Sequence, residues 1–193
     1  MVFIPKYTVT AKMLQNLGRI ELVKQSFDQQ PLSPQLLYSL RETAKVTSVH
    51  YSTYIEGNKL TLNEVSAAIQ GKNLPQKERD EKEVKSYYGA WNAMEQAVRE
   101  HQLFDEQLIA YLHTLVEGGK KNIPYRDCQN VIYDSETKAT IYLPPEFKDV
   151  PDMMRDLCDW VNVSKELPIP LVAGIVHYQF VTTVSYTHLR AHE

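Results

Sequence analysis

Apolar residues recur every three or four positions along most of this chain, a spacing that predicts helices with one buried face. The clearest case is segment 10–27, whose apolar residues keep this spacing throughout: Met13, Leu14, Leu17, Ile20 and Val23. The same pattern predicts further helices over residues 34–48, 62–71, 84–99, 105–118 and 150–161. We expect the polar run 72–83, between two of these helices, to be an exposed and solvated connector.

Two of the predicted helices begin with recognisable signals. Ser33 followed by Pro34 is typical of an N-cap residue with a proline in the first turn. Thr61 followed by Glu64 three residues later has the pattern of a capping box, in which each side chain bonds to the main chain of the other residue. These signals fix where both helices begin.

The helix that starts at residue 34 ends either near Ser48 or at the glycine stop Gly57. In the longer form it closes on Glu56, where the negative end of the helix dipole disfavours a carboxylate. From the pattern alone, Glu56 is either a solvated acid in the last turn or a residue with a role outside its helix. Ser52 lies one turn earlier on the same face, where it either positions the Glu56 carboxylate or is an ordinary surface serine.

Two short β-rich runs interrupt the helical pattern. The segment NVIYDSETKATIYLPP pairs them across a polar turn and ends on two prolines, which predicts a β-hairpin over residues 130–143. The last apolar run, residues 169–181, predicts a central buried helix, in which we expect His177 to be a core histidine rather than a catalyst. The predicted fold class is therefore mainly α with one inserted hairpin.

Composition and charge narrow the classes of function. The formal net charge is −3 over 193 residues, which disfavours a nucleic acid partner because proteins that bind nucleic acid usually present a basic face. The two cysteines, Cys128 and Cys158, provide neither a disulfide framework nor a metal quartet. The longest apolar run is too short to span a bilayer, and the first residues do not resemble a signal peptide. We therefore expect a cytoplasmic protein with no membrane partner.

Three segments, in a consistent order, resemble one known family. The stretch STYIEGN, residues 52–58, is similar to the inhibitory motif of Fic (Fido-domain) proteins, which has Ser or Thr, three variable residues, Glu, and then Gly or Asn. Residues 125–162 resemble the family's flap hairpin and the helix after it. Residues 168–182 resemble the helix that leads into the active-site loop, and the likeness covers most of residues 8–182.

The resemblance implies both an architecture and an activity. It implies a Fic-type helical bundle with an N-terminal helical region, residues 1–75, that carries the inhibitory motif. A partial Fido domain core, residues 76–183, follows and carries the flap hairpin over residues 130–143. The implied activity is that of a protein adenylyltransferase, which moves AMP from ATP to a hydroxyl side chain of a target protein, usually with Mg²⁺.

The resemblance also assigns roles to particular residues. It makes Ser52, Glu56 and Gly57 the inhibitory motif, in which Glu56 pairs with the last arginine of the active-site loop and blocks the productive position of the ATP γ-phosphate. It makes the flap an element that holds the target chain by strand addition, with plain packing as the alternative role. The candidate docking residues of the flap are Val131, Ile132, Tyr133, Thr140, Ile141 and Tyr142.

The sequence departs from the family at the active-site loop, whose pattern is HxFx(D/E)GNGRxxR. The catalytic histidine would fall near Val184, but the chain there reads TVSYTHLRAHE. No glycine turn separates His188 from Arg190, and no carboxylate stands where the family holds its metal. The stretch resembles a translated sequencing adapter, so we expect residues 184–193 to be a non-native tail on a truncated chain. We therefore predict that this chain holds no catalytic residue and no metal ligand and is inactive, whereas its parent uses ATP and Mg²⁺.

Two other classes of function fit part of the pattern. The alternative to the enzyme is a non-catalytic helical protein-binding module that uses its hairpin to hold a peptide. A helical DNA-binding regulator is disfavoured by the acidic balance and by the lack of a basic recognition helix. The target protein, the nucleotide preference, the direction of the reaction and the oligomeric state stay open at this stage.

Overall fold

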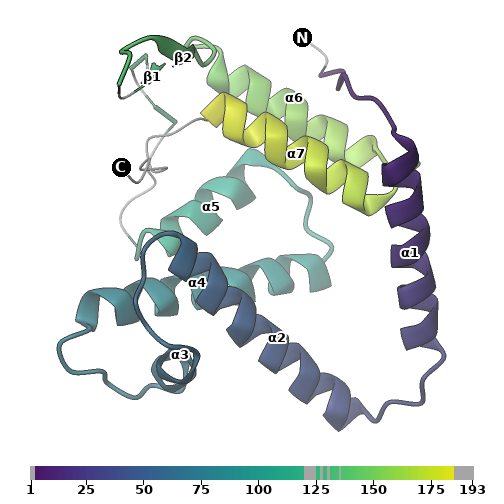
Figure 1. Ribbon diagram of the computed structural model, residues 1–193, viewed down its shortest axis with the longest axis vertical. Coiled ribbons are helices and arrows are strands. Elements are labelled where there is room, and N and C mark those ends of the chain that lie inside the picture. Colours follow the sequence, from purple (N-terminus) through teal and green to yellow (C-terminus); the bar gives the residue numbers. More distant parts are fainter. Residues whose placement is uncertain (1–2, 120–124, 127, 130, 135, 185–193) are drawn as a thin grey trace. The chain divides into compact units, whose positions relative to one another are not determined.

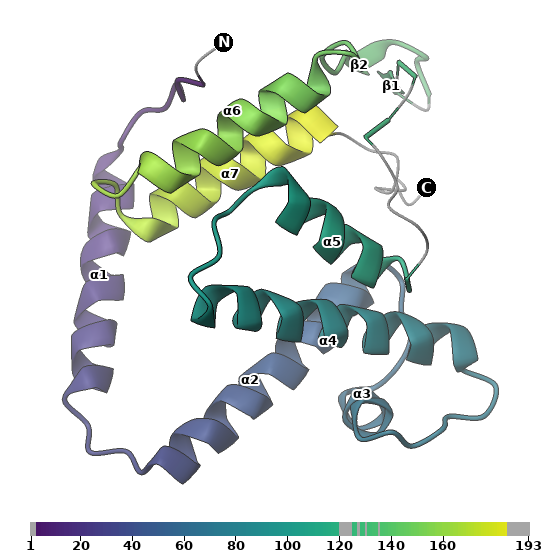
Figure 2. The same ribbon diagram turned by 180° about the vertical axis from the view of Figure 1, so that it is seen from behind.

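The computed structural model describes residues 3–119, 125, 126, 128, 129, 131–134 and 136–184. In this part the chain is mostly helical with one short hairpin, as the sequence predicts (Figure 1, and from behind in Figure 2). The elements are α1 (Ala11–Asp28), α2 (Pro34–Ile55), α3 (Leu62–Ile69), α4 (Glu78–Arg99), α5 (Glu106–Val116), β1 (Ile132–Tyr133), β2 (Thr140–Tyr142), α6 (Val150–Val163) and α7 (Ile169–Val184). Within the described ranges, no helix combines the length and the apolar character needed to cross a membrane.

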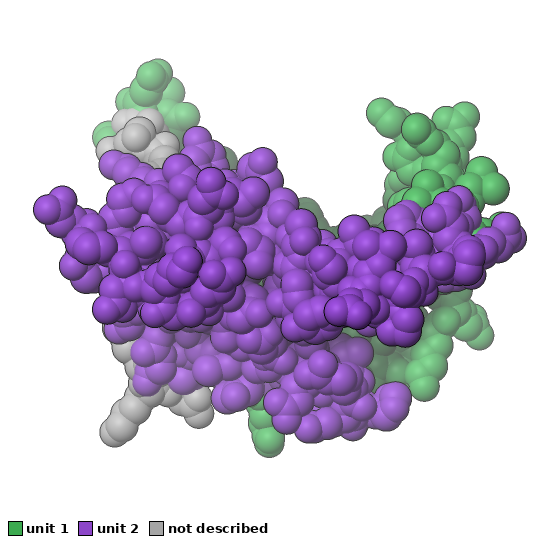
Figure 3. Space-filling model, turned by 90° about the horizontal axis from the view of Figure 1, so that it is seen from below, with its two compact units in different colours: residues 1–25, 103–107, 124–193 green, residues 26–102, 108–123 purple. Residues whose placement is uncertain are grey.

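The chain divides into two compact units (Figure 3). Unit 1 comprises Met1–Gln25, Leu103–Gln107 and Pro124–Glu193, and unit 2 comprises Ser26–Gln102 and Leu108–Ile123. Helices α2, α3 and α4 lie wholly within unit 2, whereas the hairpin, α6 and α7 lie within unit 1. The predicted division between residues 75 and 76 stays a prediction.

Both predicted N-terminal signals are confirmed. The Ser33 hydroxyl accepts a hydrogen bond from the Leu36 N–H at 3.2 Å at the start of α2. The Thr61 hydroxyl accepts from the Glu64 N–H at 3.4 Å, and the Glu64 carboxylate accepts from the Thr61 N–H at 2.9 Å, which completes the capping box of α3. The longer alternative for α2 is also confirmed, because this helix continues to Ile55.

The core of unit 2 lies where α2, α3 and α4 pack together. Its buried side chains come from these helices and from the turn after α2: Val49, Leu60, Val65, Ala68 and Val84. Burying a Val or Leu side chain stabilises a fold by about 1.5–3 kcal/mol relative to leaving it exposed. This packing therefore holds the C-terminal half of α2, the part that leads into the motif.

Helix α4 begins at Glu78, inside the polar run 72–83, so the interpretation of this run as a solvated connector is wrong in its second half. Glu81 within it is only 9% exposed. Its carboxylate pairs with Lys85 and also accepts a hydrogen bond from the Leu74 N–H at 2.8 Å, and these two contacts lower the pKa of Glu81. A carboxylate satisfied in this way can face inward, and the spacing of apolar residues does not reveal it.

In unit 1, helix α6 packs against α7. The buried face of α6 is formed by Val150, Met154, Leu157 and Cys158. Near the end of this helix, the Asn162 side chain donates to the Phe104 carbonyl at 2.9 Å and accepts from the Phe104 N–H at 3.2 Å. This pair of bonds ties the segment that precedes α5 to α6.

Helix α7 is less buried than its sequence predicts. Ile169 is 80% exposed and Tyr178 is 71% exposed. His177 is exposed too, so the expectation that it is a core histidine is wrong. Because an apolar run has apolar side chains on every face, it does not indicate which face will pack, and in the described part of the chain α7 packs on α6.

The predicted hairpin is confirmed as an antiparallel pair of short strands. Ile132 pairs with Tyr142, and Tyr133 pairs with Thr140. A register shift falls between these two pairs and leaves Ile141 outside them. The ladder is therefore shorter than the predicted range 130–143, and residue 130 lies outside the described residues.

Candidate functional site

The motif at residues 52–58 spans the end of α2 and the turn that follows. Ile55 is the last helical residue, and Glu56 is the C-cap. Gly57 has φ 96°, in the left-handed region that glycine enters without a steric penalty. The backbone itself therefore favours a glycine after Glu56.

Two main-chain hydrogen bonds close this helix end. The Gly57 N–H donates to the Tyr54 carbonyl, and the Asn58 N–H donates to the Thr53 carbonyl, both at 3.0 Å. Together they form a Schellman motif, which satisfies carbonyl groups that the helix leaves unpaired. Glu56 thus sits inside a defined turn, although it is the first residue beyond the helix.

The Glu56 side chain has no partner of its own among the described residues. Its carboxylate is exposed and makes no hydrogen bond or ion pair there. Ser52 is half-buried one turn earlier, and its hydroxyl is not hydrogen-bonded to the Glu56 carboxylate, so its positioning role stays a prediction. Because the dipole disfavours a carboxylate at a helix C-terminus, α2 itself gives no reason for a glutamate here.

Asn58 is a buried residue of this turn whose contacts the sequence reasoning missed. It is 3% exposed. Its side-chain Nδ2 donates to the Asp80 carbonyl and to the Glu83 carboxylate, both at 3.0 Å, and its Oδ1 accepts from the Leu60 N–H at 3.0 Å. The only signal in the sequence is an asparagine after a helix-stop glycine, which is equally typical of an ordinary turn.

The candidate docking residues of the flap lie together on the hairpin of unit 1. Tyr133 and Ile141 are 57% and 63% exposed, and Thr140 is exposed as well. Val131 is half-buried, and Ile132 lies in β1. Apolar side chains are therefore available on this hairpin, whereas residues 52–58 lie in unit 2. The docking role of the hairpin stays a prediction.

Side chains outside the short ladder hold the hairpin in place. The buried Arg126 donates to the Cys128 carbonyl at 3.2 Å and to the Pro145 carbonyl, which closes the base of the hairpin. The Tyr142 hydroxyl donates to the Thr182 carbonyl at 2.8 Å and so ties β2 to the last turn of α7. The sequence reasoning missed Arg126, because one arginine before a β-rich run carries no local signal.

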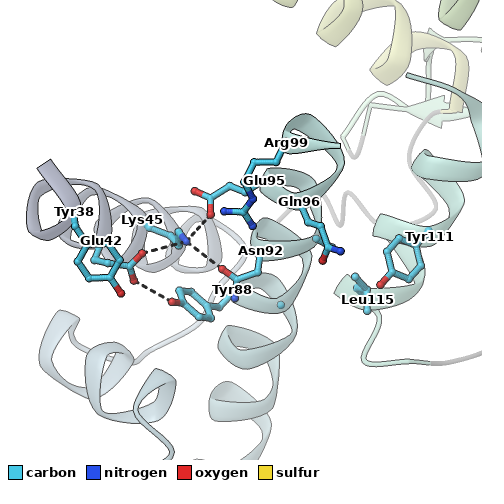
Figure 4. A pocket seen from close by; sticks show the side chains of 12 residues that line it. Tyr38, Glu42, Lys45, Tyr88, Asn92, Glu95, Gln96, Arg99, Tyr111 and Leu115 are labelled. Atoms are coloured by element: carbon cyan, nitrogen blue, oxygen red, sulfur yellow. Dashed lines mark hydrogen bonds and ion pairs between the residues drawn. The ribbon is translucent and has the colours of Figure 1, made fainter. Parts of the chain in front are cut away.

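A pocket of about 500 Å³ in unit 2 is lined by side chains of α2, α4 and α5 (Figure 4). Within it, the Lys45 ammonium lies 3.1 Å from Asn92 Oδ1, 2.8 Å from Glu95 Oε2 and 3.3 Å from Glu42 Oε1. Burial lowers the pKa of Lys45, but its bonds to both glutamates outweigh burial and raise it. The Tyr88 hydroxyl donates to Glu42 at 3.1 Å. This network satisfies its own charges and joins α2 to α4.

The expected ATP and Mg²⁺ stay predictions in the described part of the chain. No three His, Cys, Asp or Glu side chains come together there as a metal site. Val184, near which the catalytic histidine was expected, is the last residue of α7. The predicted tail beyond it, with His188 and Arg190, lies outside the described residues.

Comparisons with known proteins identify similar folds. Neither a scan against protein-family models nor a search of curated proteins finds a match. A solved Fic family protein from Desulfovibrio desulfuricans G20 is 27% identical, with a TM-score of 0.72, over 95% of this chain and 55% of that chain. A Fic domain containing signaling protein from Bacteroides thetaiotaomicron VPI-5482 is 22% identical, with a TM-score of 0.73, over 86% of this chain and 64% of that chain. The chain thus spans less than two thirds of either protein.

Proposed function

Because this chain has the fold of Fic-family proteins, we propose that it forms part of a protein adenylyltransferase, which moves AMP from ATP to a hydroxyl side chain of a target protein. In this proposal Glu56 inhibits the transfer, and the hairpin of unit 1 holds the target chain. The target protein is recognised by the hydroxyl that accepts AMP and by an extended segment around it.

The observation that carries the proposal is the setting of Glu56. Its carboxylate is exposed and unpaired among the described residues, and it stands where the dipole of α2 disfavours it. Departures from local rules are expected at functional sites, and the similarity of residues 52–58 to the inhibitory motif gives this one a role. In the motif to which Glu56 belongs, the missing partner is an arginine of the active-site loop. Pairing of the two would block the productive position of the γ-phosphate.

The hairpin supports the proposed docking of a target chain. Strand addition gives affinity through main-chain hydrogen bonds and specificity through side-chain contacts, and the exposed Tyr133 and Ile141 are available for such contacts. A non-catalytic binding module would use the hairpin in the same way. That alternative gives Glu56 no role, and the similarity to Fic proteins does not favour it.

In this proposal the chemical step needs the residues of the family's active-site loop. ATP bound with Mg²⁺ would supply the AMP group in a complete enzyme. The base, the metal ligand and the phosphate-binding turn belong to the pattern HxFx(D/E)GNGRxxR, which is absent from the 193 residues. We therefore expect no incorporation of label when this chain alone is incubated with ATP labelled at the α-phosphate.

The regulatory part of the proposal is tested in the protein expressed from its complete reading frame. Glu56→Gly should raise auto-adenylylation measured with labelled ATP, because it removes the inhibitory carboxylate. Glu100→Gly is a matched control, since Glu100 is also an exposed C-cap residue, at the end of α4 in the same unit. Unchanged incorporation in the Glu56 variant, with the loop histidine intact, would count against inhibition.

The catalytic part is tested at the locus itself. Sequencing beyond codon 182 should reveal, in frame, a histidine, a glycine-rich turn and an arginine with the spacing of the loop pattern. A genuine stop codon after Glu193 would refute the proposed enzyme. The two tests are independent, because the first concerns Glu56 and the second concerns the loop.

A further inference from the structure

We propose that Asn58 is a positioning residue for Glu56, and that its attachment to α4 sets how strongly Glu56 inhibits. This inference rests on the proposed function. It concerns regulation of the same site by a residue that touches neither substrate nor loop. The motif then consists of an inhibitory carboxylate and, two residues later, the side chain that fixes the turn on which that carboxylate is carried.

The side chain of Asn58 is bound on both of its polar atoms. Its Nδ2 donates to the Asp80 carbonyl and to the Glu83 carboxylate, and its Oδ1 accepts from the Leu60 N–H, each at 3.0 Å. At 3% exposure it is almost fully removed from solvent. A buried amide whose partners were lost would be costly to leave unpaired, so these contacts define one position for the turn. The neighbouring Lys59 N–H adds a bond to the Asp80 carboxylate at 3.2 Å.

The main chain of Asn58 links this fixed position to Glu56. Its N–H donates to the Thr53 carbonyl in the last turn of α2. Glu56 therefore lies between two constraints, the end of α2 on one side and the attachment to α4 on the other. Gly57, at φ 96°, is the one residue between Glu56 and Asn58. The direction of the Glu56 carboxylate is thereby tied to the position of the first turns of α4.

The asparagine at position 58 indicates that hydrogen bonds to α4, rather than the end of α2, determine which residue type stands here. The main-chain bond to Thr53 is available to any residue except proline at this position, so the end of α2 does not require an asparagine. The side-chain bonds do require an amide, because one atom must donate to α4 while the other accepts from Leu60. A displacement of the first turns of α4 would accordingly move Glu56 and weaken inhibition.

The test uses the protein expressed from its complete reading frame and measures incorporation from ATP labelled at the α-phosphate. Asn58→Ala should raise the rate of auto-adenylylation by about tenfold, within the range typical of coupling between two sites. Asn73→Ala is the matched control, since Asn73 is exposed in the loop between α3 and α4 of the same unit. This control should leave the rate unchanged.

A charge exchange keeps the test informative if Asn58→Ala folds poorly. Asn58→Asp keeps the size and the acceptor atom but loses both donations and places a carboxylate against that of Glu83. Asn58→Asp should therefore raise the rate of auto-adenylylation at least as much as Asn58→Ala does. The double variant Asn58→Asp/Glu83→Gln restores a donor to this contact and should return the rate toward that of the unchanged protein. General damage to folding would not be reversed by this exchange.

Combination with Glu56→Gly separates a positioning role from a structural one. If Asn58 acts only by holding Glu56, then Asn58→Ala should add no activation once Glu56 is replaced. Activation by Glu56→Gly without activation by either Asn58 variant would overturn this inference and leave the proposed function standing. Additive activation by the two changes would also overturn it. If neither Glu56→Gly nor any other variant incorporates label, the proposed function fails and the inference fails with it.

Discussion

Lys45 joins α2 to α4, and its replacement should destabilise unit 2 by an amount that the contacts allow us to work out. The ammonium contacts oxygen atoms of Asn92, Glu95 and Glu42 at 3.1, 2.8 and 3.3 Å. The lysine side chain is 7% exposed, whereas the glutamate side chains are 38% and 32% exposed. Water can therefore hydrate both carboxylates once the ammonium is removed, which limits the loss of stability.

Two variants separate the charge from the packing of the side-chain stem. Lys45→Met keeps a stem of similar size and removes the ammonium. Hydrogen bonds to charged groups contribute about 1.5–3 kcal/mol each when buried, and the exposure of the glutamates reduces the expected total loss to about 2 kcal/mol. Lys45→Ala also removes the buried methylene groups beyond Cβ, at about 0.8 kcal/mol each. We expect a total loss of about 4 kcal/mol for this variant.

Urea unfolding followed by far-ultraviolet circular dichroism measures both free energies. Lys72→Met and Lys72→Ala are the matched controls, because Lys72 is exposed in the same unit, and surface changes of this kind stay within about 0.5 kcal/mol. Equal losses for Lys45→Met and Lys45→Ala would refute the contribution of the stem. Losses equal to those of the Lys72 controls would refute the stabilising role of the whole network.

The pH dependence of the stability lost in Lys45→Met gives a second check on the role of this network. The hydrogen bond from Lys45 lowers the pKa of Glu95 in the folded chain. Its contribution is therefore fully present above the unfolded pKa of a glutamate, about 4.3, and is lost as the pH falls through the lower folded pKa. The stability difference between the unchanged protein and Lys45→Met should shrink between about pH 7 and about pH 3. A stability difference that stays constant with pH would show that the contact between Lys45 and Glu95 is not ionic.

A helix cap and a buried thiol give two further tests. Thr61→Ala should lower the free energy of unfolding by about 1 kcal/mol, because it removes the capping hydroxyl of α3, whereas Thr61→Ser should retain most of it; urea unfolding measures both. Iodoacetamide should modify Cys128, which is exposed, well before Cys158, which is 3% exposed and whose pKa is raised to about 11 by burial. Mass spectrometry follows both thiols, and equal rates in the folded chain would contradict the burial of Cys158.

The features that the sequence predicted correctly depend on residues close together in the chain. The Ser33 cap and the Thr61 capping box each join residues three positions apart. The hairpin follows from two β-rich runs on either side of a polar turn, where the Asp134 N–H donates to the Ala139 carbonyl at 2.8 Å. In each case a few neighbouring residues determine the geometry, so a short pattern is sufficient to predict it.

The features that the sequence did not predict depend on contacts between distant segments. Asn58 reaches residues 22 and 25 positions further along the chain, and no local pattern indicates these partners. Glu81 lies in a run of charged residues that reads as solvated, yet its carboxylate binds the preceding loop. For helix α7 the prediction of a buried helix failed in the opposite direction. An apolar sequence indicates that a helix can be buried, but not that another element covers it.

The three consecutive residues Glu56, Gly57 and Asn58 differ in what the fold requires of them. Gly57 is favoured by its backbone angle whatever the protein does, so a Gly57 variant would change the fold of the turn as well as the proposed regulation. Glu56 is not required by the fold, and its helix disfavours it. The Asn58 side chain attaches the turn to α4 and also accepts a hydrogen bond from the Leu60 N–H within the turn. A Glu56 variant therefore tests the proposed regulation with little change to the fold, whereas an Asn58 variant also removes buried hydrogen bonds and needs the exchange with Glu83 to separate the two effects.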